Sequence, residues 1–125
     1  MGFKSFEELQ VWKEARNFRI QITMLSKSFP AQEKYALSSQ IIRSARSITS
    51  NIAEGFGRFH HKENIQFCRM ARGSLFETLD HLICARDEGY ISEEKFTELK
   101  KQYDEILKLL NGYISYLKKL RNKDD

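Results

Sequence analysis

The sequence predicts an all-α protein, an antiparallel up-down-up-down four-helix bundle that forms a single domain over residues 1–125. In four long segments, apolar residues recur every three or four positions, the spacing of one face of a helix. Only one proline and six glycines interrupt the chain, and no strand pattern competes. Short connections between long helices place consecutive helices antiparallel. We expect the helices at about 5–28, 31–56, 60–88 and 92–120.

The first helix is expected to begin at Ser5, because Ser5-Phe-Glu-Glu8 matches a capping box, in which the serine and the glutamate satisfy backbone N–H groups. Pro30 should stop it, because a proline disfavours helical backbone at the residue before it. Its predicted core face consists of Leu9, Trp12, Ala15, Ile22, Leu25 and Phe29.

The second helix carries two different faces. Its apolar face consists of Ile41, Ala45, Ile48, Ile52 and Phe56. A narrow polar stripe is expected on the opposite side, made of Arg43, Ser47, Asn51, Glu54 and Arg58. We expect an irregular first turn between Glu33 and Leu37, and an end at Gly55 and Gly57. The stripe is either solvated, as polar helix faces usually are, or it meets a partner.

The third and fourth helices have clear end signals. Gly89 is expected as the C-cap glycine of the third helix and Ser92 as the N-cap of the fourth. The predicted core face of the third helix is Ile65, Cys68, Arg72, Leu75, Leu79, Leu82, Ile83 and Arg86, with the two arginines reaching solvent from its edges. The fourth helix has a strict three-four alternation of Phe96, Leu99, Tyr103, Ile106, Leu110, Tyr113, Leu117 and Leu120. That repeat is typical of a bundle or coiled-coil seam.

The charge balance permits a nucleic-acid partner without requiring one. The chain has 21 Lys and Arg against 17 Asp and Glu, a net charge of +4. The basic residues nearest the connection between the second and third helices are the candidate phosphate ligands: Arg43, Arg46, Arg58, Lys62, Arg69 and Arg72. The alternative, slightly favoured, is that such arginines pair with carboxylates across subunit interfaces, here Glu54 and Glu77.

A second set of residues is a candidate for subunit contacts or for structure. It consists of Ser47, Asn51, Glu54, Gly55, Gly57, Gly73, Ser74 and Glu77. Gly73 lies in the middle of a predicted helix, where glycine costs about 1 kcal/mol relative to alanine. On a face away from the core it can permit the close approach of another backbone. The alternative is a tolerated surface glycine.

Catalytic and metal-binding motifs are missing from the sequence. The adjacent His60 and His61 would point in different directions, and Glu77 and His81 are four apart, not the three of a di-iron Glu-x-x-His motif. We therefore expect no enzyme activity, no metal and no cofactor. Cys68 and Cys84 would lie about 24 Å apart along one helix, too far to bridge. With no signal peptide and no long apolar segment, we expect a cytoplasmic protein that does not bind membranes.

Several blocks of the chain, in order, carry a resemblance to a known family. They are Phe6-x-x-Leu-x-Val-Trp-x-x-Ala15, Phe29-Pro-x-x-Glu-x-Tyr35, Gln40-Ile, Arg43-x-Ala45, Ser47-Ile-x-x-Asn-Ile-Ala-Glu-Gly-x-Gly-Arg58, Phe67, Ala71-Arg-Gly-Ser-Leu-x-Glu77 and Gly89-Tyr-Ile91. In these the chain resembles the 23S rRNA intervening-sequence proteins, small four-helix bundles sometimes described as a ribosomal protein. It departs from the family pattern at Ala36, where glycine is common, and at Ser44, where a second arginine is common.

The resemblance implies a bacterial homo-oligomer, with a ring of five subunits expected. It also implies similarity to the accessory variability protein of diversity-generating retroelements, a basic assembly that binds nucleic acid. RNA is the favoured partner, because founding members of the family are encoded inside inserts of 23S rRNA genes. The family has no established catalytic residues. The competing hypothesis is a protein-interaction scaffold with no nucleic-acid role.

Overall fold

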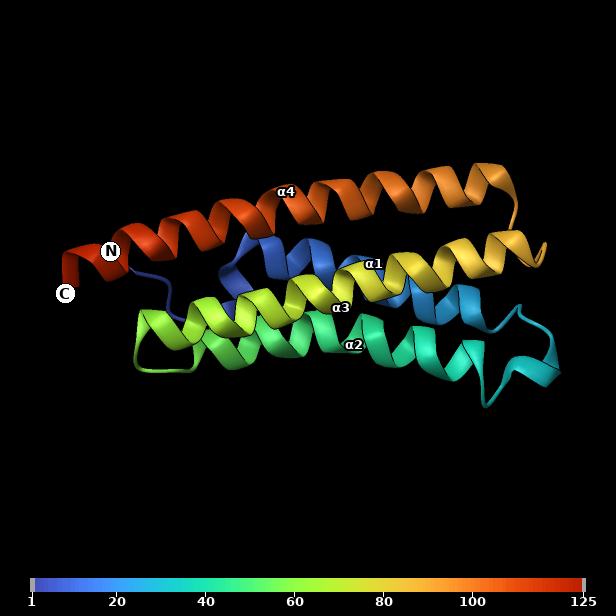
Figure 1. Ribbon diagram of the computed structural model, residues 1–125, viewed down its shortest axis with the longest axis horizontal. Helices are drawn as coiled ribbons and strands as arrows, with labels where there is room; N and C mark the ends of the chain where they lie inside the picture. Colours follow the sequence, from blue (N-terminus) through green and yellow to red (C-terminus); the bar gives the residue numbers. More distant parts are fainter. Residues whose placement is uncertain (1, 125) are drawn as a thin grey trace.

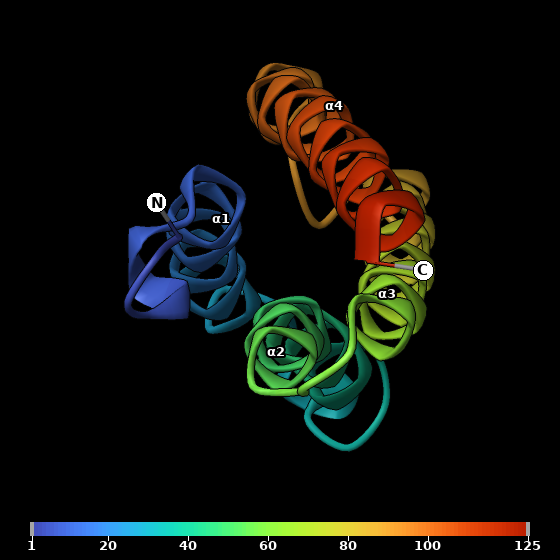
Figure 2. The same ribbon diagram turned by 90° about the vertical axis from the view of Figure 1, so that its left-hand side faces the viewer.

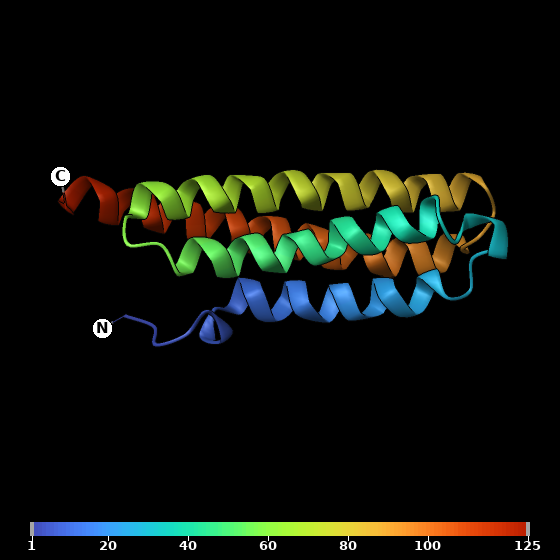
Figure 3. The ribbon, with the colours of Figure 1, turned by 90° about the horizontal axis from the view of Figure 1, so that it is seen from below.

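A computed structural model describes residues 2–124 of the protein (Figure 1). The described chain forms four α-helices and no strand: α1 (Gln10–Ser26), α2 (Leu37–Phe56), α3 (His61–Asp87) and α4 (Glu93–Asp124). Two short 3-10 turns, η1 (Phe6–Glu8) and η2 (Ala31–Glu33), precede α1 and α2. Successive helices run in opposite directions along the bundle (Figures 1 and 3). The predicted all-α four-helix fold is confirmed.

The four helices follow one another around the bundle when it is viewed end-on (Figure 2). The most extensive packing is between α2 and α3, and that between α1 and α4 is the sparsest of the neighbouring pairs. Both ends of the chain lie at the end of the bundle that carries the α2–α3 connection (Figure 1). The structure therefore brings the last turns of α4 close to the start of α3.

The first helix begins later than the sequence predicted. The capping box at Ser5 is present, but it caps η1 and not α1. Leu9 has extended backbone, with φ −71° and ψ 126°, and it separates the two elements while its side chain is buried. Helix α1 therefore runs from Gln10 to Ser26 instead of from 5 to 28. Its end lies four residues before Pro30, which disfavours helical backbone at Phe29.

The other helix ends follow local signals in the sequence. Helix α2 begins at Leu37 and not at 31 as predicted, because the irregular turn expected between Glu33 and Leu37 precedes the helix; the Leu37 N–H donates to Glu33 Oε1 at 3.3 Å. Helix α3 begins at His61, with His60 as its N-cap. Gly89 has φ +77° and follows the C-cap Glu88, as predicted. The N–H of the next residue donates to the Ala85 carbonyl at 2.9 Å, a Schellman closure.

The fourth helix begins as predicted but continues further than expected. The Ser92 hydroxyl accepts from the Lys95 N–H at 3.0 Å, so Ser92 caps the helix. Helix α4 then runs to Asp124, four residues beyond the predicted end at 120. These last turns project the basic end of the chain from the bundle.

The predicted core faces needed adjustment in three helices. In α1, Val11 and Phe18 are buried, whereas Trp12 and Leu25 pack only partly against the core. In α4, Ile114 is buried and Tyr113 is partly exposed. In α3, Ile65, Cys68, Leu75 and Leu82 are buried as predicted, whereas Leu79, Ile83, Arg72 and Arg86 are only half-buried. Four small or polar residues are buried in its interior as well. Those interior residues are Asn64, Ala71, Thr78 and Ala85.

Gly55 does not end α2, contrary to the sequence-based expectation. It is buried inside the helix, where a Cβ atom would lie 2.6 Å from Asn64 Oδ1 and 2.8 Å from Phe67 Cβ. Its missing side chain lets α3 approach α2 closely. The helix ends one residue later, at Phe56, and Gly57 is its C-cap with an ordinary right-handed φ of −76°.

Candidate nucleic-acid interface

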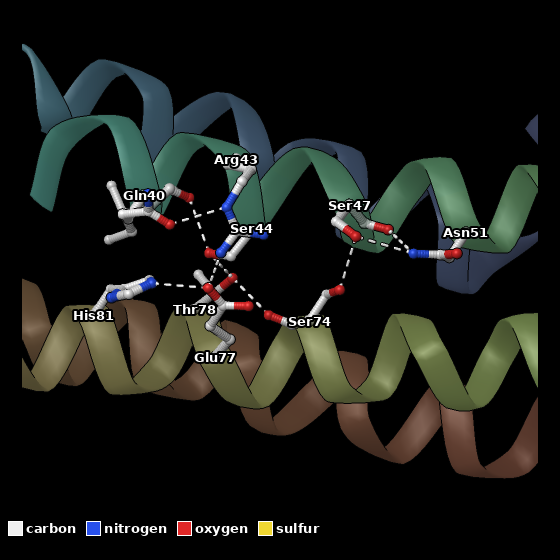
Figure 4. Close-up of polar contacts among 10 residues, drawn as sticks. Gln40, Arg43, Ser44, Ser47, Asn51, Ser74, Glu77, Thr78 and His81 are labelled. Atoms are coloured by element: carbon white, nitrogen blue, oxygen red, sulfur yellow. Dashed lines mark hydrogen bonds and ion pairs between the residues drawn. The ribbon is translucent and has the colours of Figure 1, made fainter. Parts of the chain in front are cut away.

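The seam between α2 and α3 contains a hydrogen-bonded polar network (Figure 4). Thr78 Oγ1 lies 2.8 Å from Ser44 Oγ, and both side chains are buried. One turn along, the Ser74 hydroxyl donates to Ser47 Oγ at 2.8 Å. Asn51 Nδ2 donates to the Ser47 carbonyl at 2.8 Å and to its Oγ at 3.0 Å. Part of the predicted polar stripe is therefore half-buried against α3, not directly opposite the core.

Glu77 joins two cationic side chains at the surface of this seam. One of its oxygens pairs with the Arg43 guanidinium and lies 3.1 Å from His81 Nε2. Arg43 also donates from Nε to Gln40 Oε1 at 3.0 Å. The Arg43 side chain is 54% exposed, so this surface ion pair is worth about 0–1 kcal/mol. Arg43 keeps N–H groups that face solvent.

Arg58 and Lys62 lie at the end of the bundle, on either side of the start of α3. The Arg58 guanidinium is 3.4 Å from Glu54 and 3.7 Å from Glu63, and it lies over the Phe67 ring at 4.8 Å. Lys62 is exposed in the first turn of α3. Glu54 and Arg58 thus pair within one chain.

Arg69 and Arg72 occupy a third location, on the side of α3 that borders α4. Arg72 donates to Asn111 Oδ1 of α4 at 2.7 Å. Arg69, one turn earlier, is exposed and has no ion pair within residues 2–124. The six basic residues singled out in the sequence are therefore divided among three parts of the surface.

Arg43 and Arg46 share an open hollow on the outer side of α2, which we name the α2 basic hollow. It has a volume of about 700 Å³ and is lined by Lys34, Tyr35, Ser39, Ile42, Arg43, Arg46, Ser47 and Ser50. No carboxylate is among the described residues that line it. Tyr35 is 85% exposed, and the Lys34 ammonium lies 5.3 Å from its ring centroid. Arg46 has no ion pair within the described chain.

A second hollow adjoins the first across α2, which we name the α1–α2 hollow. It has a volume of about 610 Å³, and Arg46 and Ser50 belong to both hollows. Its apolar lining includes Trp12, Ile20 and Met24, the last of which is 65% exposed. Here Arg19 of α1 donates to Thr49 Oγ1 of α2 at 2.9 Å.

Sequence reasoning missed three contributors to these hollows, namely Arg19, Lys34 and Tyr35. Lys34 and Tyr35 lie in the irregular segment before α2, where helical spacing assigns no face. A usable signal did exist in α2, because Ser39, Arg43, Arg46 and Ser50 follow helical spacing and are all exposed. The outer face of α2 thus carries cations and hydroxyls together.

In the part of the chain that the structure describes, the remaining candidate residues form no further binding or metal site. No heavy atom lies within 4 Å of a Cβ built on Gly73, so nothing in the described chain covers this position. Within residues 2–124 there is no group of three or more His, Cys, Asp or Glu side chains that could hold a metal. Burial raises the pKa of the Cys68 thiol from its ordinary value of 9.0 to about 12. None of the helices in the described range combines the length and hydropathy needed to span a membrane.

Comparison with known proteins identifies the family of the chain and a structural relative. The family model of the 23S rRNA-intervening sequence protein matches residues 7–112. No curated protein matches the chain. A solved structure from Bacteroides thetaiotaomicron VPI-5482, described as a protein with unknown function from the S23 ribosomal protein family, is similar with a TM-score of 0.78 and 28% identity. The match covers 84% of this chain and 95% of that one. The chain belongs to the 23S rRNA-intervening sequence protein family.

Proposed function

We propose that this protein is a non-enzymatic, homo-oligomeric four-helix bundle that associates with RNA through the α2 basic hollow. The observation that carries the proposal is the composition of that hollow. It combines Lys34 and Arg46 with Arg43, whose guanidinium also pairs with Glu77, and with three serine hydroxyls and an exposed tyrosine; its described lining has no carboxylate.

The chemistry of this lining suits a phosphate backbone. Arginine binds phosphate oxygens with paired N–H donors, and serine hydroxyls add neutral hydrogen bonds. The exposed ring of Tyr35 offers a surface on which a base can stack. The name of the family refers to an intervening sequence of 23S rRNA, which makes RNA the favoured nucleic acid.

Self-association is supported by the apolar part of the α1–α2 hollow. The exposed side chains of Ile20 and Met24, beside the partly exposed Trp12, form a surface on which a second copy can pack. The family resemblance suggests a ring of five subunits. Repeating the α2 basic hollow in a ring would convert a modest charge per subunit into a strong multivalent site. We place this assembly in the cytoplasm, a reducing compartment in which the thiols of Cys68 and Cys84 would stay free.

The same apolar surface favours a second candidate function. If Trp12, Ile20 and Met24 bind a different protein, the chain is an interaction scaffold with no RNA role. In that case Arg46, at the edge of both hollows, is part of a protein interface. Arg46 also lines the surface on which a second copy would pack, so charge reversal at Arg46 distinguishes the two functions when RNA binding and the oligomeric state are measured on the same variant.

The test compares Arg46→Glu with the matched control Arg69→Glu. Both arginines are exposed, lie on helices and have no ion pair in the described chain, but Arg69 lies outside both hollows. Binding to a fluorescently labelled structured RNA is measured by anisotropy over a range of salt concentrations. We expect Arg46→Glu to weaken binding by roughly tenfold or more and to reduce the salt slope by about 1, because phosphate contacts are lost. The control should bind like the wild type.

Two results would contradict the RNA function. In the first, Arg46→Glu binds RNA with the same affinity and salt dependence as the wild type. In the second, neither protein binds RNA, and Arg46→Glu breaks up the oligomer. The second result supports the scaffold.

A further inference from the structure

Exposed aromatic rings gather at the end of the bundle that carries the α2–α3 connection. A cavity of about 200 Å³ lies there, and its lining includes Phe3, Phe56, Phe59, Tyr113 and Tyr116 together with Arg58. We name Phe59, Tyr113, Tyr116, Lys119 and Lys123 the end cluster. The cluster lies outside both hollows on α2, and its chemistry is different.

The rings of the end cluster contact neighbouring side chains and are open to solvent to different degrees. Phe59 is 91% exposed, and its ring stands edge-on against His60 with centroids 4.8 Å apart. Tyr113 and Tyr116 stack at 6.3 Å with an interplanar angle of 23°, and Tyr116 is 43% exposed. The Tyr113 hydroxyl accepts from Asn64 Nδ2 of α3 at 3.2 Å, which holds the stack in place. The Phe59 ring is too exposed to contribute to the core, so its surface is available to a ligand.

Positive charge follows the same face of α4. Tyr116, Lys119 and Lys123 are spaced i, i+3 and i+7, which puts them on one side of the helix. Both lysines are exposed, and neither has an ion pair within residues 2–124. In the cavity lining, the Arg58 guanidinium is already held by Glu54 and Glu63. The two lysines are therefore α4 cations that can bind an anion near Tyr116, and Lys62, in the first turn of α3, is a further exposed cation at this end of the bundle.

We propose that the end cluster binds a single-stranded segment of RNA. Unpaired bases stack on Phe59 and Tyr116, while Lys119 and Lys123 contact the adjoining phosphates. A duplex keeps its base faces stacked on each other, so only a single strand can offer them to aromatic side chains. The inference rests on the proposed function, since it assumes that RNA is the ligand, and it adds a preference for unpaired nucleotides at a second site.

The test measures binding of the full chain to a single-stranded RNA of ten nucleotides that carries one 2-aminopurine, and to a duplex of the same length. The wild type is compared with Phe59→Ala, with the double variant Lys119→Glu/Lys123→Glu, and with the control Phe76→Ala. Phe76 is 49% exposed on α3 and lies outside the end cluster. Phe59 is nearly fully exposed, so its removal leaves the fold intact.

We expect the wild type to bind the single strand more tightly than the duplex and to change the 2-aminopurine fluorescence on binding. Phe59→Ala should weaken single-strand binding by roughly 5- to 150-fold, corresponding to about 1–3 kcal/mol per stacked base. Its duplex binding should stay unchanged. The double lysine variant should weaken single-strand binding and flatten its salt dependence. Phe76→Ala should behave like the wild type.

The possible failures are distinguishable. If the wild type binds both RNAs but Phe59→Ala and the lysine variant change neither affinity, the end-cluster inference is wrong and the proposed RNA function stands. If the variants weaken single-strand and duplex binding equally, the preference for unpaired bases is wrong. If the wild type binds neither RNA, both the inference and the proposed function fail.

Discussion

Gly55 and Gly73 both occupy interior positions of helices, but only Gly55 has neighbours where a side chain would stand. A Cβ on Gly55 would clash with Asn64 and Phe67, whereas a Cβ on Gly73 would meet open space. Gly55→Ala should therefore destabilise the protein by about 1–3 kcal/mol through overpacking. Gly73→Ala should stabilise it by up to about 1 kcal/mol, because alanine is the better helix former. Urea unfolding of the two variants measures both effects.

The Gly73 variant also tests where subunits meet. If Gly73 is a surface glycine, alanine leaves the oligomer unchanged. Loss of the oligomer in Gly73→Ala would show that the backbone of another subunit approaches there, as the sequence analysis allowed.

A Gly55→Ala variant that is more stable than the wild type would contradict the close packing of α2 on α3.

The two cysteines should differ in reactivity. Burial raises the pKa of Cys68 to about 12, whereas Cys84 is exposed. At pH 8 a thiol reagent should modify Cys84 in the folded protein and reach Cys68 only after unfolding. Fast modification of both thiols in the native state would contradict the buried position of Cys68.

The same pKa shift predicts how stability depends on pH. The unfolded thiol of Cys68 ionises near its ordinary pKa of 9.0, but the folded one stays protonated until about pH 12. Its contribution to stability is therefore complete below pH 9 and is lost as the pH rises toward 12. A Cys68→Ala variant should lose this part of the decline when unfolding is followed from pH 8 to pH 11.

At the scale of elements, the α2–α3 seam combines tight packing with a polar interior. The buried pair of Ser44 and Thr78 can be tested by a double-mutant cycle with Ser44→Ala and Thr78→Val. Each single variant should lower the free energy of unfolding by about 1 kcal/mol, because it leaves one buried hydrogen-bonding group without its partner. The double variant removes both groups, so its loss of stability should be about 0.5–1.5 kcal/mol smaller than the sum of the two single losses. The exposed Ser50→Ala serves as the control, with a change within about 0.5 kcal/mol. Strict additivity of the two core variants would contradict a coupled pair.

Periodicity predicted the helices well, because an amphipathic helix needs only local spacing. The prediction of where α1 begins failed, because the capping signal belonged to a short 3-10 turn and not to the α-helix. The capping box at Ser5 closed the short turn η1, and the buried Leu9 then broke the helix. The interior of α3 was also predicted incompletely. Thr78 can be buried because its hydroxyl has hydrogen-bond partners in Ser44 Oγ and the Ser74 carbonyl. Ser44 belongs to the neighbouring helix α2, so the spacing of residues along α3 does not reveal this contact.

The candidate site was predicted only in part for the same reason. Arg43 and Arg46 share a hollow as helical spacing suggests, but the other four basic candidates lie elsewhere on the surface. Lys34 and Tyr35 join the hollow from an irregular segment whose path depends on the fold. The rings and lysines of the end cluster come together only because α4 returns to the start of α3 (Figure 1).

At the scale of the whole molecule, charge is modest and its placement matters more than its sum. A net charge of +4 on a single chain gives weak attraction to RNA. Several copies in one assembly would present as many basic hollows at once, and linked sites bind far more tightly than one. We therefore predict that self-association and RNA binding occur together. Variants that dissociate the oligomer should lose most of the RNA affinity.

Light scattering on a size-exclusion column, with the protein alone and then with a structured RNA, tests the central claim most directly. We predict one defined oligomer that elutes with the RNA at low salt and releases it at high salt, since phosphate contacts weaken steeply as salt rises. A defined oligomer that ignores RNA at every salt concentration would contradict the RNA function and support the scaffold. A monomer that ignores RNA would contradict both the RNA function and the proposed self-association.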